Sequence, residues 1–230
     1  MDQKTRAMKT LSFNDKAKHL LILITLLVIC LKMMAVTPEE EFRLMKQKNG
    51  IDLFYRWMVM PEGNRVRQMK AVFEGGWTKE DIMYLLKNEQ QAMAWIPSAR
   101  EYRNLKEATA GEWFSYIRFS APWPLADQDC ILQYSLSTEP SGESTIRFTC
   151  RPDYIPEVDG ITRMKDINGS FVICPGSGEK GRVECYFISS KASVIPRWIT
   201  DPIITGSIIS LMEGMRGQLS GVEYSQTLQK

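Results

Sequence analysis

Histidine is nearly absent from this chain. The only one is His19, and it lies in the first 35 residues, so residues 36–230 contain none. Nucleophilic sites of the Ser-His-Asp and Cys-His types use an imidazole as base, and many metal centres use it as a ligand. The sequence excludes those sites, and we expect no catalytic residue, no cofactor and no metal ion.

An excess of positive charge is also missing from most of the chain. The formal net charge is +2, and residues 1–35 carry +4 from six Lys/Arg and two Asp/Glu, which leaves −2 for residues 36–230. Domains that bind nucleic acid concentrate Lys and Arg on one surface. We therefore expect no nucleic-acid partner. With 44% apolar and 24% charged residues, the chain has the composition of a globular domain with a sizeable core.

One long apolar run is present, from Leu20 to Leu31, and five Lys/Arg precede it. As a helix it would span about 18 Å, short of the roughly 30 Å of a bilayer core. A basic segment before a short apolar run predicts a signal peptide over residues 1–35. An uncleaved anchor over residues 20–36 and a buried core helix are the alternatives. We expect an exported protein, periplasmic or extracytoplasmic, released or anchored, with residues 36–230 as its domain.

Residues 36–230 predict an α+β domain. Helix signals begin at Thr37, with an expected end near Lys48, and again at Thr78, with an expected end near Trp95. Alternating apolar residues and turn signals predict strands over 51–59, 65–73, 100–108, 112–120, 130–137, 145–150, 161–175 and 182–189. A long last helix should follow from 196 to about 219. This order is typical of an antiparallel sheet with helices on one face.

The last helix has an unusual composition. Pro202 predicts a break that separates residues 196–201 as a short segment. Gly206, Gly214 and Gly217 lie in its interior, and each such glycine weakens a helix by about 1 kcal/mol relative to alanine. Two interpretations stay open. The weakened helix forms a movable lid, or the glycines let it pack closely on the sheet.

Three motifs occur in order along the chain. Residues 113–129 contain Ala-Pro-Trp-Pro between two strand-like runs; residues 168–175 read Asn-Gly-Ser-Phe-Val-Ile-Cys-Pro; and residues 194–200 read Val-Ile-Pro-Arg-Trp-Ile-Thr. Together they resemble the START (steroidogenic acute regulatory-related lipid transfer) domain over residues 40 to 220. The resemblance implies a helix-grip fold, in which a curved antiparallel sheet wraps the long last helix around an apolar tunnel. It implies a monomeric carrier of one lipid or sterol-like molecule that works at a membrane surface.

The chain departs from the family at two places. The family's Arg-Asp pair reads Gln128-Asp129, where the resemblance implies a structural role for the missing arginine. Sterol-binding members have an acid and an arginine in the tunnel, and those positions fall on Ser115 and Tyr134, both neutral hydroxyls. The resemblance also implies that the loop Glu139–Glu143 helps to gate the tunnel.

Strand and helix periodicity adds apolar residues to Ser115 and Tyr134, and together they form a candidate ligand wall. Ser115 shares a strand face with Ile117, and Tyr134 shares one with Leu132. The whole candidate set is Ser115, Ile117, Leu132, Tyr134, Phe148, Trp198, Ile203, Ile208 and Met212. An apolar wall with a few polar atoms is typical of a lipid site. The alternative is that Ser115 forms a hydrogen bond with a neighbouring backbone group and Tyr134 with a water molecule, so that neither contacts a ligand.

Two other functions stay open at this stage. A polyketide cyclase-like enzyme of the same fold would need a general acid or base, and the available carboxylates are Glu112, Asp127, Asp129 and Glu184. A protein-interaction module would bind its partner in the groove instead.

Four cysteines fall in predicted strands. Free buried thiols are the favoured interpretation. A disulfide between Cys130 and Cys150 is the alternative, if the hairpin between them folds about Pro140-Ser141.

Overall fold

The structure is a computed structural model of the chain, and it describes residues 40–109, 111–121, 126–176, 181–189 and 197–227. Residues Glu40–Lys230 form a compact unit. The predicted leader, residues 1–35, lies outside the described residues. Within the described ranges, no helix combines the length and the apolarity that crossing a membrane requires.

The unit is built on one sheet of ten strands. Their order is β1-β2-β3-β10-β9-β7-β6-β5-β4, all antiparallel, and the short β8 pairs in parallel with β6 beside this path. The bounds are β1 Arg43–Lys48, β2 Ile51–Val59, β3 Arg65–Glu74, β4 Ala99–Thr109, β5 Glu112–Phe119, β6 Gln128–Thr138, β7 Ser144–Cys150, β8 Thr162–Arg163, β9 Ile167–Cys174 and β10 Arg182–Ser189.

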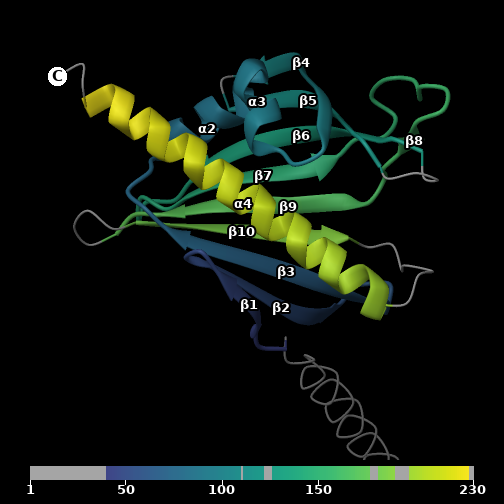
Figure 1. Cartoon of the computed structure of the whole chain (residues 1–230), viewed down its shortest axis with the longest axis horizontal. Coiled ribbons are helices and arrows are strands. Elements are labelled where there is room, and N and C mark those ends of the chain that lie inside the picture. The colour runs from purple at the N-terminus through teal and green to yellow at the C-terminus, as the bar shows by residue number, and fades with distance from the viewer. Residues whose placement is uncertain (1–39, 110, 122–125, 177–180, 190–196, 228–230) are drawn as a thin grey trace, which may run out of the picture. The chain divides into compact units, whose positions relative to one another are not determined.

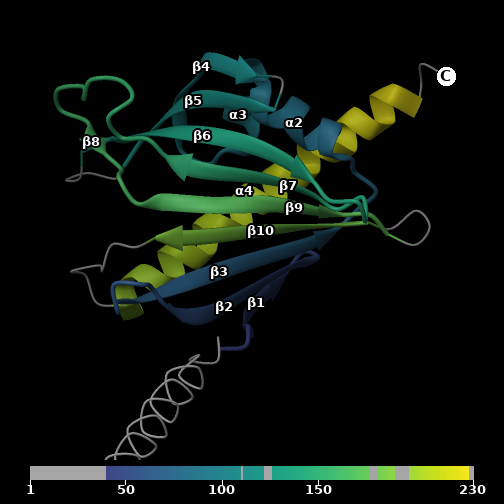
Figure 2. The same cartoon turned by 180° about the vertical axis from the view of Figure 1, so that it is seen from behind.

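The described helices all lie on one side of this sheet. They are α2 Lys79–Lys87, α3 Glu89–Trp95 and α4 Arg197–Thr227. α4 runs diagonally across the sheet, and α2 and α3 lie on the same side near β4 and β5 (Figure 1). From behind, the strands face the viewer and the helices lie behind them (Figure 2). The expected α+β class is confirmed, with a curved antiparallel sheet around a long C-terminal helix.

Apolar side chains opposite one another on neighbouring strands form the core. One such row crosses five strands, and it consists of Leu53, Ala71, Cys185, Phe171 and Ile146. The buried residues of α4 complete the same cluster: Ile208, Ile209, Met212, Met215 and Leu219. Burying one such aliphatic or aromatic side chain stabilises the fold by about 1.5–3 kcal/mol.

The helix predicted from Thr78 to Trp95 is present as two helices. Thr78 caps α2 as expected: its Oγ1 accepts a hydrogen bond from the Asp81 backbone N–H, and the Asp81 carboxylate accepts one from the Thr78 backbone N–H. At Asn88 the helix ends, and the Asn88 side chain accepts a bond from the Gln91 N–H to begin α3. Asparagine is as good an N-cap as aspartate, which explains the restart.

The helix predicted over residues 37–48 is wrong in its described part. Residues Arg43–Lys48 form β1, and Asn49 and Gly50, both with positive φ, make the turn into β2. An isolated helix of this length is only marginally stable in water. Pairing with β2 satisfies the backbone donors and acceptors instead, so tertiary contact overrides the local signal.

The break predicted at Pro202 is also wrong. α4 continues through Pro202, which lies near its start. The preceding residue, Asp201, accepts two 2.8 Å hydrogen bonds from the Arg67 guanidinium of β3. These bonds hold the pKa of Asp201 below its ordinary value, so the carboxylate is charged at neutral pH. This anchoring offsets the cost of a proline inside the helix.

The three glycines of α4 differ in their surroundings. A Cβ atom on Gly214 would lie 2.5 Å from the backbone oxygen of Trp95, so this glycine lets α3 and α4 touch. A Cβ atom on Gly206 or Gly217 would meet nothing within 4 Å. Gly214 therefore allows a close approach to the helix α3 and not, as the close-packing interpretation expected, to the sheet, while the other two glycines only weaken the helix.

A buried ion pair takes the place of the family's Arg-Asp pair. Asp129 on β6 accepts hydrogen bonds of 2.7 and 3.1 Å from Arg163 on β8, and the two side chains are 1% and 0% exposed. Arg163 also donates to three backbone carbonyls of the 152–156 segment. The arginine missing at Gln128 is thus supplied from a distant position, and it fixes the loop between β7 and β8.

Replacing Arg163 with methionine should lower the free energy of unfolding by about 3–5 kcal/mol, because Asp129 would stay buried without its partner. Urea unfolding measures this loss. The matched control is Lys165→Met, which removes the ion pair between Lys165 and Glu157, side chains that are 59% and 60% exposed. The control should change stability by no more than about 1 kcal/mol. Equal losses of unfolding free energy in the two variants would show that the buried Arg163–Asp129 pair stabilises the fold no more than an exposed ion pair does.

Alanine at Gly214 should destabilise the protein by about 1–3 kcal/mol, because the new methyl group overlaps the backbone of α3. Alanine at Gly217 should stabilise it by up to about 1 kcal/mol, because only helix propensity changes there. Thermal unfolding of the two variants checks the opposite signs. A stabilising Gly214→Ala would show that α3 and α4 do not pack this closely.

Candidate functional site

Aromatic side chains form a row on the face of the sheet that packs toward α4. Trp113, Tyr134 and Phe148 lie directly opposite one another on β5, β6 and β7. The rings of Trp113 and Tyr134 stack with centroids 4.8 Å apart, and Phe148 lies 6.2 Å from Tyr134. Phe148 also contacts Phe171 on β9 and Phe187 on β10, at 5.5 and 6.0 Å. These five residues, the inner wall, make a continuous apolar surface.

Gly169 makes this row possible. It lies opposite Phe148 in the register, and a Cβ atom there would lie 2.4 Å from the Phe148 ring. The same atom would lie 2.0 Å from the backbone oxygen of Tyr186. The glycine of the Asn168-Gly-Ser-Phe motif thus has a packing reason, since it leaves space for the Phe148 ring.

Three hydroxyl groups meet beside the inner wall, from Tyr102, Ser115 and Tyr134. The Tyr102 hydroxyl lies 3.1 Å from Ser115 Oγ and donates to the backbone carbonyl of Leu86. Ser115 donates to Asn104 Oδ1 at 2.9 Å, and Tyr134 is hydrogen-bonded to Tyr102. Burial raises the pKa of Tyr102 to about 12 and that of Tyr134 well above its ordinary value. The cluster is therefore neutral at physiological pH.

Seven of the nine predicted ligand-wall residues are buried on the inner side of the sheet or of α4. They are Ser115, Ile117, Leu132, Tyr134, Phe148, Ile208 and Met212. The other two lie apart from them, since Trp198 is 78% exposed and Ile203 is 64% exposed. The apolar stripe of α4 thus faces the sheet from Thr205 onward, while the first turns present apolar side chains to solvent.

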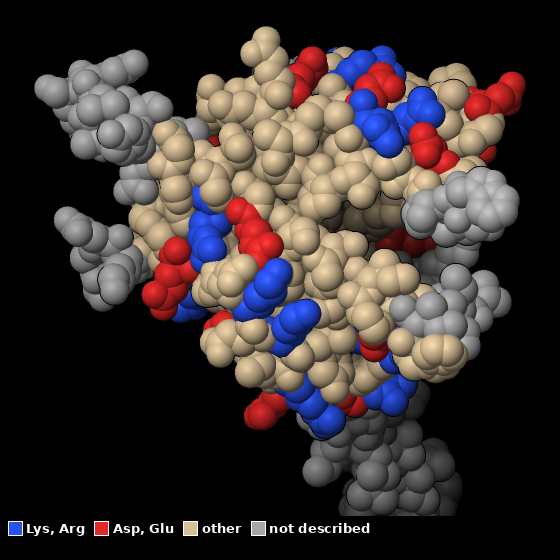
Figure 3. Space-filling view, viewed as in Figure 1, with Lys and Arg blue, Asp and Glu red and all other residues tan. Residues whose placement is uncertain are grey.

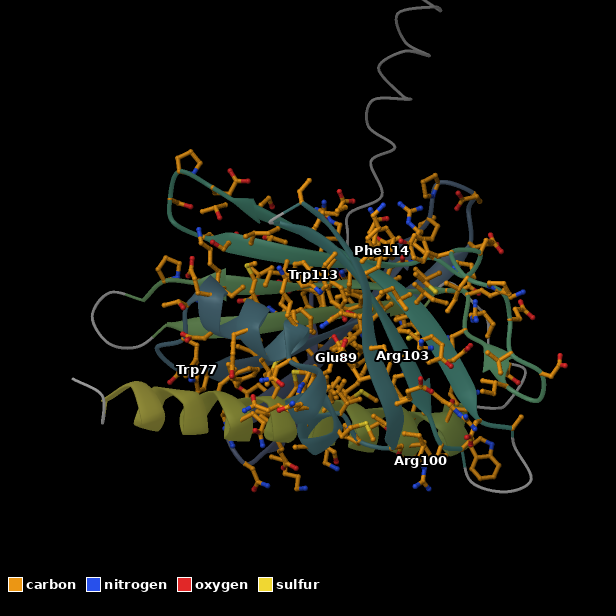
Figure 4. All side chains as sticks on the ribbon, turned by 90° about the horizontal axis from the view of Figure 1, so that it is seen from above. Trp77, Glu89, Arg100, Arg103, Trp113 and Phe114 are labelled. Atoms are coloured by element: carbon orange, nitrogen blue, oxygen red, sulfur yellow. The ribbon has the colours of Figure 1, made fainter. Side chains whose placement is uncertain are left out.

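The predicted ligand wall includes neither Trp113 nor Tyr102, although strand alternation puts Trp113 on the same face as Ser115. Tyr102 is flanked by polar residues on a strand with three register shifts, so no alternation marks it as buried. Trp113 and its neighbour Phe114 lie on opposite sides of β5, with Trp113 on the α4 side (Figure 4). Phe114 instead stacks on Tyr154, with ring centroids 4.2 Å apart.

The four carboxylates considered for catalysis each have a bonding partner. The pairs are Glu112 with Gln133, Asp127 with Arg118, Asp129 with Arg163, and Glu184 with Arg182 and Tyr186. In the strands, Asp129 and Glu184 directly precede inward-facing cysteines, so their side chains point to the other side of the sheet. In the described ranges, no group of His, Cys, Asp and Glu could hold a metal ion.

The four strand cysteines are free thiols: Cys130, Cys150, Cys174 and Cys185. The alternative of a disulfide between Cys130 and Cys150 is wrong, because the register places Leu132 opposite Cys150. Burial raises the pKa of all four thiols. They act as small apolar side chains, as the favoured interpretation expected.

The surface is hollowed on the side that α4 covers, toward the N-terminal end of the helix (Figure 3). The first turns of α4 expose Trp198, Ile203 and Ile204. Two contacts hold these turns to the sheet. One is the Arg67–Asp201 ion pair, and in the other Arg197 lies 4.0 Å from the ring centroid of Trp57.

The loop that the family resemblance implicates in gating is the turn of the β6–β7 hairpin. The Glu139 N–H donates to the Glu143 carbonyl at 2.8 Å, and Gly142 has a φ of 87°. The hairpin is present, but its register centres on Ser141, so the predicted fold about Pro140-Ser141, which would have placed Cys130 opposite Cys150, is wrong.

Comparison with known proteins connects this geometry to solved structures. No protein-family model matches the sequence, and no curated protein does. The STAR-related lipid transfer protein of Xanthomonas axonopodis has a TM-score of 0.68 at 23% identity, over 79% of this chain and 99% of that one. Human StAR-related lipid transfer protein 5 has 0.64 at 13% identity, over 90% and 99%. Human STARD10 has 0.63 at 16% identity, over 81% and 76%.

Structural similarity at sequence identities this low establishes the shared fold but does not identify a ligand. The matches span most of both chains, and the shared arrangement is the one described above, a curved antiparallel sheet around a long last helix. The chain has the helix-grip fold of the START lipid-transfer domains.

Proposed function

We propose that this chain carries one hydrophobic molecule, a lipid or a sterol-like compound, in a tunnel between the sheet and α4, for transport or sensing. The observation that carries this proposal is the inner wall: five aromatic residues beside neutral hydroxyls, with the candidate carboxylates paired elsewhere. Such a wall gives affinity through buried apolar area, and a few polar atoms orient the ligand. The names of the similar structures, as lipid transfer proteins, support the same class.

The structure favours a carrier over an enzyme of the cyclase type. A cyclase would need a general acid or base beside its substrate. The buried polar side chains described on the inner side are the hydroxyls of Ser115, Ser144 and Thr205 and the tips of Tyr102 and Tyr134. The raised pKa values of the two tyrosines make them poor bases at neutral pH.

We further propose that the first turns of α4 lie against a membrane during ligand exchange and that α4 acts as a lid. Trp198, Ile203 and Ile204 are exposed in the first turns of α4, and tryptophan and aliphatic side chains suit a membrane interface. Opening this end would break one ion pair and one cation–π contact, whereas opening the other end would expose the core residues of α4. The protein would act as a monomer outside the cytoplasm, released or anchored by residues 20–36.

Native mass spectrometry of the purified protein, followed by solvent extraction, should reveal one bound lipid per chain. Enlarging Leu132 or Tyr134 to tryptophan should reduce its occupancy severalfold, because both side chains are buried beside the inner wall. Leu44→Trp is the matched control, since Leu44 is exposed and should leave occupancy unchanged. A protein that stays empty after exposure to a mixed lipid extract would favour the enzyme and interaction-module alternatives.

Serine at both Trp198 and Ile203 should reduce co-flotation with phospholipid vesicles severalfold, because the exposed apolar surface at the start of α4 would be lost. Serine at Tyr84 and Val158, which are also exposed but on other elements, provides the control. An equal loss of flotation in both double variants would contradict the proposal that the first turns of α4 make the membrane contact.

A further inference from the structure

Trp113 carries a buried polar group that has no partner in the described part of the chain. Its side chain is 2% exposed, and its indole Nε1–H meets no hydrogen-bond acceptor. Buried donors in folded proteins are nearly always paired, because leaving one unpaired costs free energy. The unpaired N–H therefore points to a group that the protein itself does not supply.

Both faces of the Trp113 ring are occupied. The ring of Tyr134 stacks on it at an interplanar angle of 6°, and Lys87 Nζ lies 4.8 Å from its centroid. What remains for further bonding is the ring edge, where Nε1 lies. This edge belongs to the inner wall, on the α4 side of β5 (Figure 4).

Two of the neighbouring hydroxyls, those of Tyr102 and Ser115, have no hydrogen to spare, because each hydroxyl carries one. Tyr102 donates to the Leu86 carbonyl, and Ser115 donates to Asn104. A ligand oxygen that arrives here would find lone pairs on these groups. The hydrogen that it could accept is on Trp113.

Two other buried indoles also lack a partner, Trp77 and Trp95, but their positions differ. Trp77 lies against the backbone of Gly75 and packs edge-on against Phe73. Trp95 ends α3, where Gly214 of α4 approaches its backbone. Both are contacts between elements, and neither ring stacks on a residue of the hydroxyl cluster.

We propose that Trp113 Nε1 is the polar subsite of the ligand tunnel and that it binds a carbonyl or hydroxyl oxygen at one end of the lipid. The inference rests on the proposed carrier function and narrows its ligand class. A hydrocarbon ligand would leave the Trp113 indole N–H buried without a hydrogen-bond acceptor. The oxygen of an oxygenated lipid of the same length would accept a hydrogen bond from it. A ligand hydroxyl would in addition donate to a lone pair of Tyr134. The hollow lies toward the other end of the strands, so the apolar tail would extend toward it (Figures 1 and 3).

The test compares three probes of equal chain length: hexadecane, hexadecanol and the methyl ketone of the same length. Each is added to the ¹⁵N-labelled protein, and the six tryptophan indole N–H signals are followed by NMR. Trp113→Phe assigns its own signal by removing it and keeps the ring that stacks on Tyr134. Trp95→Phe is the matched control, because it removes another buried, unpaired indole N–H.

The alcohol and the ketone should shift the Trp113 indole proton downfield and slow its exchange with solvent, while the hydrocarbon does neither. Trp113→Phe should weaken binding of the ketone about tenfold more than it weakens binding of the hydrocarbon, the size of one buried hydrogen bond. Trp95→Phe should change neither affinity.

Equal binding of all three probes, with no selective shift at Trp113, would overturn the subsite and leave the carrier function intact. Failure of every probe and of a mixed lipid extract to bind the unaltered protein would overturn the carrier function itself, and the subsite with it.

Discussion

The pairing of β3 with β10 is the constraint on which the rest of the structure depends. It joins the strands formed by residues 43–74 to those formed by residues 99–174, with β9 on the other side of β10. Without it, the sheet would fall into two pieces, and neither could surround α4. The core row of Leu53, Ala71 and Cys185 runs through this junction, so burial and backbone pairing reinforce each other there.

Charge is distributed so that the carboxylates of β6 and β10 lie away from the inner wall, while the Arg67–Asp201 ion pair lies at the first turns of α4. Strand alternation sends Cys130 and Cys185 inward, and the carboxylates beside them, Asp129 and Glu184, outward. Outside, Asp129 meets the guanidinium of Arg163, and the same guanidinium ties down the loop between β7 and β8. Beside the inner wall, the polar groups include the hydroxyls of Tyr102 and Tyr134, whose pKa values are raised by burial. This separation suits the containment of an apolar ligand and leaves no acid or base placed for catalysis in the described wall.

α4 has two ends with different means of attachment. From Thr205 to Leu219 it is held by buried apolar side chains and, at Gly214, by close approach to α3. Its first turns are held by the Arg67–Asp201 ion pair and by Arg197 over Trp57, and their large apolar side chains face solvent. Ionic and cation–π contacts at a surface are weaker than an apolar core. The first turns are therefore the part of α4 that can move at least cost.

The sequence by itself determined the fold class, most strands and the N-cap of α2, because alternation and capping are local properties. It also placed Ser115 and Tyr134 on apolar strand faces. Tertiary structure decided what local patterns do not encode: that residues 43–48 pair as a strand, that α4 runs through Pro202, and that Tyr102 joins the hydroxyls. The tertiary structure also exposes the side chains of Trp198 and Ile203 to solvent. Each of these depends on contacts between residues far apart in the chain, whose free energy outweighs local propensity.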